Sequence, residues 1–303
     1  MKPRNHLGVI FKILFFHVFR FYVSKIITLF SFIIMNFQYA SDLHLEFAQN
    51  KKALSKRPLQ PTAETLLLAG DIMPLSEIEK HPDFLNYISD HFKMTYWLPG
   101  NHEYFGADLA AWPNPFEESI RSNIVLLNNK TIHLEDSIGP IQLVFSTLWS
   151  HIPSNLTETV AKRMRDFGQI RLNGYALSPA TYNQLHQEAI SFLASSLSPT
   201  KDLSNCPENN PGSNPSRKLV ISHHLPSFSN YPKKHQNDPI NAGFASNLDD
   251  FIVKMAPNAW IFGHHHSNIP PFLIGETPLY TNQLGYIKYK EGQAFNREAV
   301  ISI

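Results

Sequence analysis

Cysteine is nearly absent from this chain: Cys206 is the one example among 303 residues. An internal disulfide framework is therefore impossible, which fits a protein of a reducing compartment such as the cytoplasm. A structural zinc site built from several cysteines is excluded for the same reason. Cys206 lies in a polar stretch rich in Ser, Asn and Pro, so no nucleophilic role is indicated for it.

Charged residues are also sparse. They make up 17% of the chain, and the formal net charge is +1. No overall electric field therefore favours nucleic acid or an acidic surface, and no basic stripe with interleaved aromatic residues indicates a nucleic-acid hydrolase. The hydrophobic fraction of 43% is that of an ordinary globular protein. A chain of this length has room for one large or two ordinary domain cores.

A clean membrane-spanning run is missing as well. Residues 7–35 are dominated by Ile, Leu, Phe and Val, but basic residues such as Arg20 interrupt them, and no convincing signal-peptide cleavage site follows. Three interpretations compete: an amphipathic or re-entrant membrane anchor, a tilted spanning helix, and a non-native extension before a true start at Met35. We favour the last. Residues 1–35 are then an apolar extension and 36–303 the domain, with a cytoplasmic location expected and membrane association as the alternative.

Beyond the extension, short apolar runs alternate with polar loops and helical patterns, which is typical of an α/β protein. Thr65–Ala69 is apolar throughout, as expected for a strand covered on both faces, and Ser76–Lys93 has helical spacing. A helical, polar stretch at 151–216 interrupts the alternation, and we expect it to be an insertion packed over a site. The other predicted strands are Asn36–Ala40, Thr95–Leu98, Ile124–Leu127, Thr131–Leu134, Ile141–Phe145, Lys218–Ile221, Ala259–Phe262, Pro278–Gln283, Tyr286–Lys290 and Ala299–Ile303.

Histidine, in contrast, is abundant, with fifteen residues, and many of them lie in polar clusters directly after predicted strands. In open α/β sheets, sites form beyond the carboxyl ends of the strands, so we expect such clusters to converge on one rim. The five clusters are Asp42-Leu43-His44, Gly70-Asp71, Gly100-Asn101-His102-Glu103, Ser222-His223-His224 and Gly263-His264-His265-His266.

These clusters offer carboxylate, imidazole and amide groups without thiolate. That set suits first-row divalent or trivalent metals in a hydrolytic site. The candidates exceed what one ion with open positions needs, so two metal ions are implied, and Asp71 is central enough to bridge them. Manganese, iron, zinc and nickel all accept such ligands, and the sequence does not choose among them.

The ordered set of five clusters resembles the calcineurin-like metallophosphoesterase superfamily over residues 36–303, and the opening run is similar to small bacterial phosphoesterases. The resemblance implies a four-layer αββα sandwich. His102 corresponds to the family's catalytic histidine, which contacts phosphate or protonates the leaving oxygen, and Glu103 would support the ligands from behind. The implied ligands are Asp42, His44, Asp71 and His266 for one metal, and Asp71, Asn101, His223 and His264 for the other.

The resemblance further implies hydrolysis of a phosphodiester or phosphomonoester, by in-line attack of a hydroxide that bridges the two metals. One alternative is a membrane-associated hydrolase of lipid or nucleotide-lipid phosphates, with residues 7–35 as its anchor. Another is a non-catalytic interaction module of the same fold, although neither the implied ligands nor His102 are lost. Fold and metals do not fix the substrate, and the oligomeric state is not encoded in any pattern that we recognise.

Several histidines have competing interpretations. His224 rivals His223 as a ligand, because one strand end does not direct both side chains to the metals. His265 lies between two implied ligands and is expected to point away. Packing or surface roles are expected for the histidines that belong to no cluster, which are His133, His151 and His186.

The predicted insertion carries a cluster of charged residues with two interpretations. It forms either a solvated helix face or, if the insertion covers the metals, a grip for a substrate phosphate. In the second case Arg165 and Arg171 are the candidate substrate-binding residues, because guanidinium groups bind phosphate oxygens in pairs. The whole cluster consists of Arg163, Arg165, Asp166 and Arg171.

Overall fold

The computed structural model describes residues 34–198, 216–232 and 235–303. Apart from Ile34 and Met35, the predicted extension lies outside these ranges, as does Cys206. Within the same ranges, no helix has the length and hydrophobicity needed to cross a membrane.

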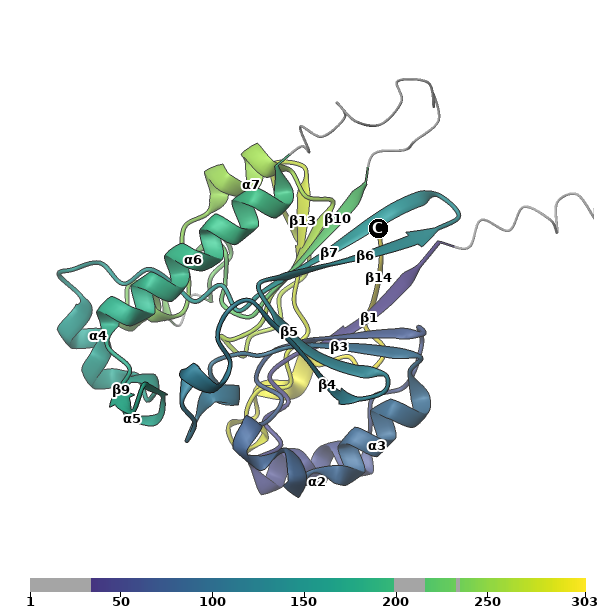
Figure 1. Cartoon of the computed structure of the whole chain (residues 1–303), viewed down its shortest axis with the longest axis horizontal. Coiled ribbons are helices and arrows are strands. Elements are labelled where there is room, and N and C mark those ends of the chain that lie inside the picture. The colour runs from purple at the N-terminus through teal and green to yellow at the C-terminus, as the bar shows by residue number, and fades with distance from the viewer. Residues whose placement is uncertain (1–33, 199–215, 233–234) are drawn as a thin grey trace, which may run out of the picture.

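Two six-stranded mixed sheets form the centre of the fold (Figure 1). The first sheet runs in the order β14 (Val300–Ser302), β1 (Asn36–Ala40), β2 (Thr65–Ala69), β3 (Met94–Leu98), β5 (Ile124–Asn128) and β4 (Phe116–Arg121). The second runs in the order β12 (Phe272–Ile274), β13 (Thr277–Tyr280), β11 (Ala259–Ile261), β10 (Arg217–Ser222), β7 (Gly139–Ser146) and β6 (Lys130–Asp136).

The inner strands of each sheet are parallel, and the strands at both edges pair antiparallel. The carboxyl ends of β1, β2 and β3 therefore meet at one rim of the first sheet, and those of β10 and β11 meet at one rim of the second. This arrangement is what brings the five polar clusters of the sequence together.

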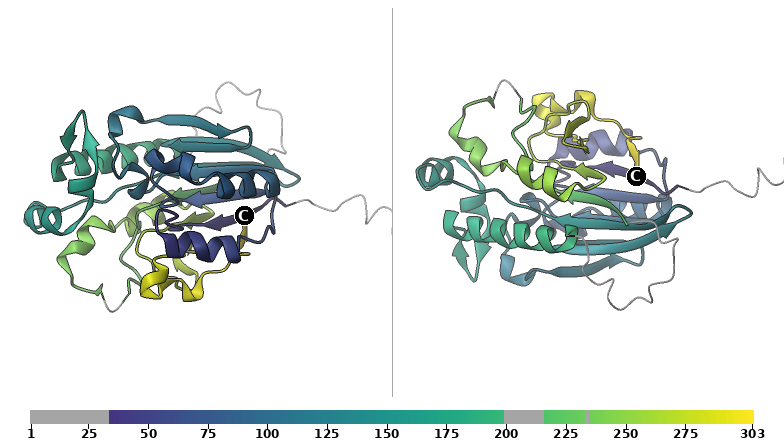
Figure 2. Two further views of the ribbon diagram at one scale, coloured as in Figure 1. Left: turned by 90° about the horizontal axis from the view of Figure 1, so that it is seen from below. Right: turned by 90° about the horizontal axis from the view of Figure 1, so that it is seen from above.

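Helices cover the outer face of each sheet (Figures 1 and 2). The helices α2 (Ala48–Lys56) and α3 (Pro82–His91) pack on the first sheet, and α6 (Pro179–Leu197) and α7 (Asp249–Met255) pack on the second. A further apolar cluster, made of residues from both sheets, fills the space between them. The predicted four-layer sandwich is confirmed.

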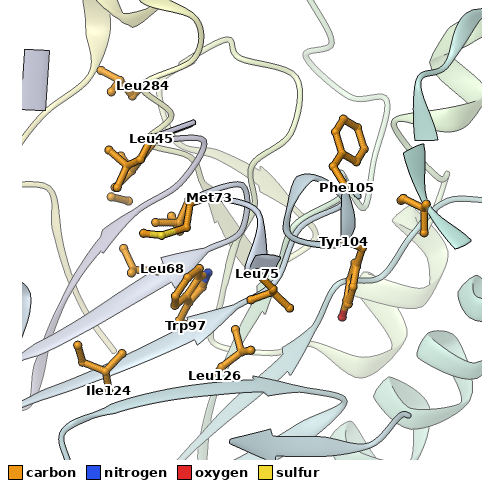
Figure 3. Packing of buried hydrophobic residues seen from close by; sticks show 14 of the residues in the cluster. Leu45, Leu68, Met73, Leu75, Trp97, Tyr104, Phe105, Ile124, Leu126 and Leu284 are labelled. Carbon is orange, nitrogen blue, oxygen red and sulfur yellow. The ribbon is translucent and has the colours of Figure 1, made fainter. Parts of the chain in front are cut away.

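Strand β2 shows why a run of leucines suits a strand that is covered on both faces. Leu66 and Leu68 pack toward the helices of the first sheet, and Leu67 packs toward the second sheet. All three side chains are fully buried, and each burial contributes about 1.5–3 kcal/mol. Figure 3 shows Leu68 beside Trp97, in the cluster between the first sheet and its helices.

Two predicted elements were wrong. The single helix expected at Ser76–Lys93 is a 3-10 helix, η1 (Leu75–Lys80), followed by α3. Pro82 separates them, because it has no N–H and disfavours helical geometry at the residue before it. The strand expected at Tyr286–Lys290 is the 3-10 helix η7 (Ile287–Tyr289), and the residue that follows it, Lys290, has a φ of 61°. Helices α2 and α7 and the edge strands β4 and β12 were not predicted.

Beyond β7 the chain forms four short elements at one end of the molecule, followed by a long helix that packs on the second sheet (Figure 1). They are α4 (Thr157–Arg163), α5 (Asp166–Gln169), the strands β8 (Arg171–Leu172) and β9 (Tyr175–Ala176), and then α6. This part of the predicted insertion is mostly helical, as expected, and also contains the two short paired strands β8 and β9. Its end at residue 216 stays a prediction, because 199–215 lie outside the described ranges.

An ion pair between Arg217 and Asp136 in the second sheet also binds Met35 and the C-terminal residue Ile303. Arg217 donates to the Asp136 carboxylate and to the Ile303 carbonyl oxygen (2.6 Å), and the Met35 N–H donates to Asp136 (2.8 Å). Burial raises the pKa of Asp136, but the bonds from Arg217, Met35 and Ile138 outweigh it and lower the pKa to about 2.

The Arg217–Asp136 ion pair is expected to make the free energy of unfolding depend on pH in the acid range. Because folding depresses the pKa of Asp136, its stabilisation of about 1–2 kcal/mol is present above pH 4 and is lost as the pH falls toward 2. Asp136→Asn should therefore lower the free energy of unfolding at pH 6 and flatten its decline below pH 4. Urea unfolding at several pH values measures both, with Asp250→Asn on the surface of α7 as the control. If the free energy of unfolding fell equally below pH 4 in the wild type and in Asp136→Asn, the assignment to Asp136 would be contradicted.

Candidate metal centre

All seven predicted ligands lie at the shared rim of the two sheets. The ligand atoms of Asp42, His44, Asp71 and His266 lie within 4.8 Å of one another, and so do those of Asp71, His223 and His264. The remaining predicted ligand, Asn101, places its Oδ1 3.2 Å from His223 Nε2. The residues thus form two adjacent groups that share Asp71, which is the grouping that the family resemblance implies.

Asp71 divides its carboxylate between the two groups. Its Oδ2 lies 3.7 Å from His44 Nε2, and its Oδ1 lies 3.3 Å from His223 Nε2. The side chain is buried, and burial raises its pKa, but the nearby imidazoles of His223 and His102 outweigh this effect and hold the pKa well below the ordinary value. A carboxylate in this position is able to bind two cations at once.

Three imidazoles are oriented by acceptors behind them. Each one uses Nδ1 for a bond away from the centre, so its Nε2 faces inward. The bonds are His44 Nδ1 to Glu46 (3.0 Å), His266 Nδ1 to Glu291 (2.7 Å) and His223 Nδ1 to the Ala69 carbonyl oxygen (2.9 Å). His264 differs, because its Nδ1 faces His223 Nε2 at 3.1 Å and its Nε2 is buried without a partner.

Consequently, His44 Nε2 and His266 Nε2 face each other at 2.9 Å. With one proton on Nδ1 of each ring, both Nε2 atoms carry lone pairs, so the contact needs either a second proton or a cation between them. Burial lowers the pKa of His266, but its bonds to Asp42 and Glu291 outweigh this effect and raise the pKa to about 10, so a proton fills the place that a bound cation would take. The residues therefore fit a metal centre, and their outer carboxylates are the usual partners of metal-binding histidines.

The backbone around the centre is strained. Five of the seven predicted ligands have φ between 48° and 80°, a region that residues other than glycine rarely adopt: Asp42, His44, Asp71, His264 and His266. Such strain persists where the surrounding structure enforces it, and it concentrates at functional sites. Gly100 is required for a different reason: a Cβ atom at this position would lie 2.2 Å from Asp71 Oδ1, so a larger residue would displace the Asp71 carboxylate.

Glu103 supports the centre from behind and is completely buried. Its carboxylate accepts four hydrogen bonds, from the N–H groups of Asp71 (2.8 Å), Ile72 (2.7 Å) and Gly100 (2.7 Å) and from Trp97 Nε1 (2.9 Å). Burial and the Asp71 carboxylate raise the pKa of Glu103 to about 7, and the donated bonds oppose that rise. One side chain thus fixes the turns after β2 and β3 to each other.

Glu103→Gln is expected to destabilise the fold. The new NH2 group faces donors, so two buried N–H groups lose their acceptor, at about 1–3 kcal/mol each. We expect the melting temperature to fall by about 10 °C, given about 2–4 °C per kcal/mol for chains approaching this size. Thermal unfolding of the metal-free protein measures the change, with Glu117→Gln on the partly exposed strand β4 as the control. An unchanged melting temperature would show that the network adds little.

His102 lies beside the two groups. Its Nδ1 is 2.9 Å from Glu46, its Nε2 is 3.3 Å from the Tyr286 hydroxyl, and its ring stacks on Phe105. Burial lowers the pKa of His102, but the carboxylates of Asp71 and Glu46 outweigh that effect and raise it. The imidazole is therefore able to hold a proton next to the predicted ligands.

The geometry favours His223 over His224 as a ligand. Both ring nitrogens of His224 are engaged elsewhere, with the Tyr182 hydroxyl at 2.9 Å and the Thr147 carbonyl oxygen at 3.1 Å. His265 meets Gln283 through Nδ1 at 2.8 Å, away from the two ligand groups. The buried His186 contacts a backbone carbonyl.

A cavity of about 290 Å³ extends from the predicted ligands to the insertion. Arg165 lines it, with its guanidinium carbon 5.8 Å from the centre of the Phe105 ring. Arg171 is not among the lining residues that the structure describes, and it donates to the Gly174 carbonyl oxygen at 2.9 Å. A solvated helix face is wrong for Asp166, which lines the cavity and is 4% exposed.

Four residues near the centre were not assigned a role from the sequence. Glu46 follows His44 by two positions, so its place in the first motif was a usable signal. Tyr286 and Glu291 come from the C-terminal segment, and Asp166 comes from the insertion. No pattern in the sequence connects these three residues to the motifs.

The comparisons with known proteins agree with this geometry. The model of the calcineurin-like phosphoesterase family matches residues 35–268, and the chain therefore belongs to that family of metallophosphoesterases. It is 28% identical over 293 residues to "Uncharacterized protein L509" of Acanthamoeba polyphaga mimivirus, a match that covers 88% of this chain and 96% of that protein. The buried His and Asp groups are consistent with two metal ions.

A solved structure, that of phosphopantetheinyl hydrolase (PptH) from Mycobacterium tuberculosis, is also similar. It superimposes with a TM-score of 0.60 at 16% identity, covering 89% of this chain and 96% of the other. Identity this low shows a shared fold and carries no information on the substrate.

Proposed function

We propose that this protein is a dinuclear metallophosphoesterase that hydrolyses a phosphomonoester or phosphodiester by in-line attack of water. The observation that carries the proposal is the pair of ligand groups that share Asp71, with imidazole nitrogens of His44 and His266 facing each other at 2.9 Å. One ion would be held by Asp42, His44, Asp71 and His266, and the other by Asp71, Asn101, His223 and His264.

Two bound ions of manganese, iron, zinc or nickel would lower the pKa of a coordinated water and offset charge on the phosphate oxygens. The chain's own residues supply the remaining chemistry. Glu46 orients His102, whose Nε2 faces the Tyr286 hydroxyl at the cavity wall, and His102 then contacts the phosphate or gives a proton to the leaving oxygen. Arg165 lines the same cavity and lies over the Phe105 ring on which His102 stacks, so it is positioned to bind a phosphate oxygen.

The test is a substrate and metal panel. Metal-free protein is supplied with each metal in turn and assayed on p-nitrophenyl phosphate and on bis-p-nitrophenyl phosphate. We expect two ions per chain and hydrolysis that depends on them. Two bound ions without hydrolysis of any ester would favour the non-catalytic module. Absence of both binding and hydrolysis would refute the proposal.

A further inference from the structure

Among its described residues, the insertion contributes one acidic side chain to the wall of the cavity, that of Asp166. Asp166 is the first residue of α5 and is 4% exposed. Its Oδ1 is buried and has no hydrogen-bond partner, and no lysine, arginine or histidine in the described ranges forms an ion pair with the carboxylate. A buried carboxylate oxygen in this state is unusual, because nearly all buried polar atoms have a partner.

The surroundings of Asp166 supply one side-chain partner, the predicted ligand Asn101, whose hydrogen bond opposes the rise that burial causes in the pKa of Asp166. That contact leaves the Oδ1 atom without a partner. On the insertion side, the same cavity is lined by apolar groups, including Phe105, Met164 and Phe244. Helix α5 has four residues, and no side-chain hydrogen bond from Asp166 caps it. On this side the lining combines apolar groups with Arg163, Arg165 and Asp166, so Asp166 supplies the one carboxylate among the described lining residues of the insertion. A few polar groups in an otherwise apolar wall are how binding pockets fix the orientation of a ligand.

We propose that Asp166 is a specificity residue, whose carboxylate accepts a hydrogen bond from an amino or hydroxyl group on the alcohol part of the phosphate ester. The inference rests on the proposed function, because the metal end must hold the phosphate for the alcohol part to reach the insertion. A pocket that offers a buried acceptor binds a ligand with the matching donor and rejects the analogue without one.

Three phosphonates test the proposal, since they resist hydrolysis and differ at one atom: propylphosphonate, 2-hydroxyethylphosphonate and 2-aminoethylphosphonate. Each is measured as a competitive inhibitor of the chromogenic ester that the metal-loaded protein hydrolyses. The wild type should bind at least one donor-bearing compound about tenfold more tightly than propylphosphonate or better. Comparison of the amino and hydroxyl compounds shows which donor is preferred.

In Asp166→Ala the discrimination should disappear, while the inhibition constant of propylphosphonate stays within about threefold of the wild-type value. Asp166→Asn, which keeps the shape of the side chain, should lose any preference for the ammonium group and retain preference for the hydroxyl. Glu158→Ala, an exposed change in α4 of the same insertion, should leave the pattern of the wild type.

Two results would overturn the inference and leave the proposed function intact. One is a wild type that hydrolyses esters but binds all three phosphonates equally. The other is an Asp166→Ala protein that loses metal and weakens equally toward all three, which would assign Asp166 to support of the neighbouring Asn101. A wild type that binds no metal and hydrolyses nothing would refute the proposed function, and this inference with it.

Discussion

Asp71→Asn is expected to abolish hydrolysis and to remove metal at the same time. The carboxylate faces His44 with one oxygen and His223 with the other, so it belongs to both ligand groups. The amide has one oxygen and no charge, and its NH2 group would face imidazole nitrogens or a cation. Loss of a residue that hydrogen-bonds to a metal ligand typically lowers metal affinity or activity by about 10–100-fold. Loss of a ligand that both metals share should therefore lower kcat/KM by on the order of 10³-fold or more.

Metal content and steady-state kinetics are measured together in this variant. The asparagine oxygen still accepts the hydrogen bond that Asp71 receives from the His102 N–H, so the metal-free protein should fold and melt near the wild-type temperature. Asp83→Asn, in the first turn of α3, serves as a matched control and should keep both metals. Two bound ions and full activity in Asp71→Asn would remove Asp71 from the centre of the proposed mechanism.

The sequence predicted the rim of the fold well because its motifs are local. Asp42, Asp71 and His223 each come one to two residues after an apolar run, and the ends of such runs mark the ends of strands. The sheets then bring those ends together by their parallel pairing. The backbone at the ligands was not predictable in the same way. His264 and His266 both have positive φ, so turns rather than an extended segment direct their side chains toward the rim.

Residues that reach the site through tertiary packing could not be identified from the sequence. Glu291 lies 25 positions after His266, and the two meet only because the C-terminal segment folds back over the rim. The sequence placed Asp166 in a cluster with three arginines and so favoured a solvated position, whereas its burial follows from the packing of the insertion around the cavity. Neither the contact between Glu291 and His266 nor the burial of Asp166 corresponds to a periodicity or a motif spacing in the sequence. The break in the predicted helix, in contrast, has a local signal, which is Pro82 itself. The prediction of one helix gave more weight to the helical spacing of the apolar residues than to this proline.

His102→Ala is expected to keep both metals and to slow turnover by about 10²–10⁴-fold, the usual contribution of a positioned acid or base. Its imidazole is bound by Glu46 and Tyr286, and it belongs to neither of the two groups that share Asp71. Removing it should therefore leave the metal ligands in place. His133→Ala, on the exposed face of strand β6, is the matched control.

The choice of ester decides between the two roles of His102. If it protonates the leaving oxygen, the loss in kcat should be larger for alkyl esters than for p-nitrophenyl esters, because p-nitrophenolate leaves without a proton. If it binds the phosphate, the loss should be similar for both and KM should rise. Metal content measured on the same samples separates either effect from damage to the ligands. Unchanged turnover on both kinds of ester, with two ions bound, would exclude His102 from the reaction.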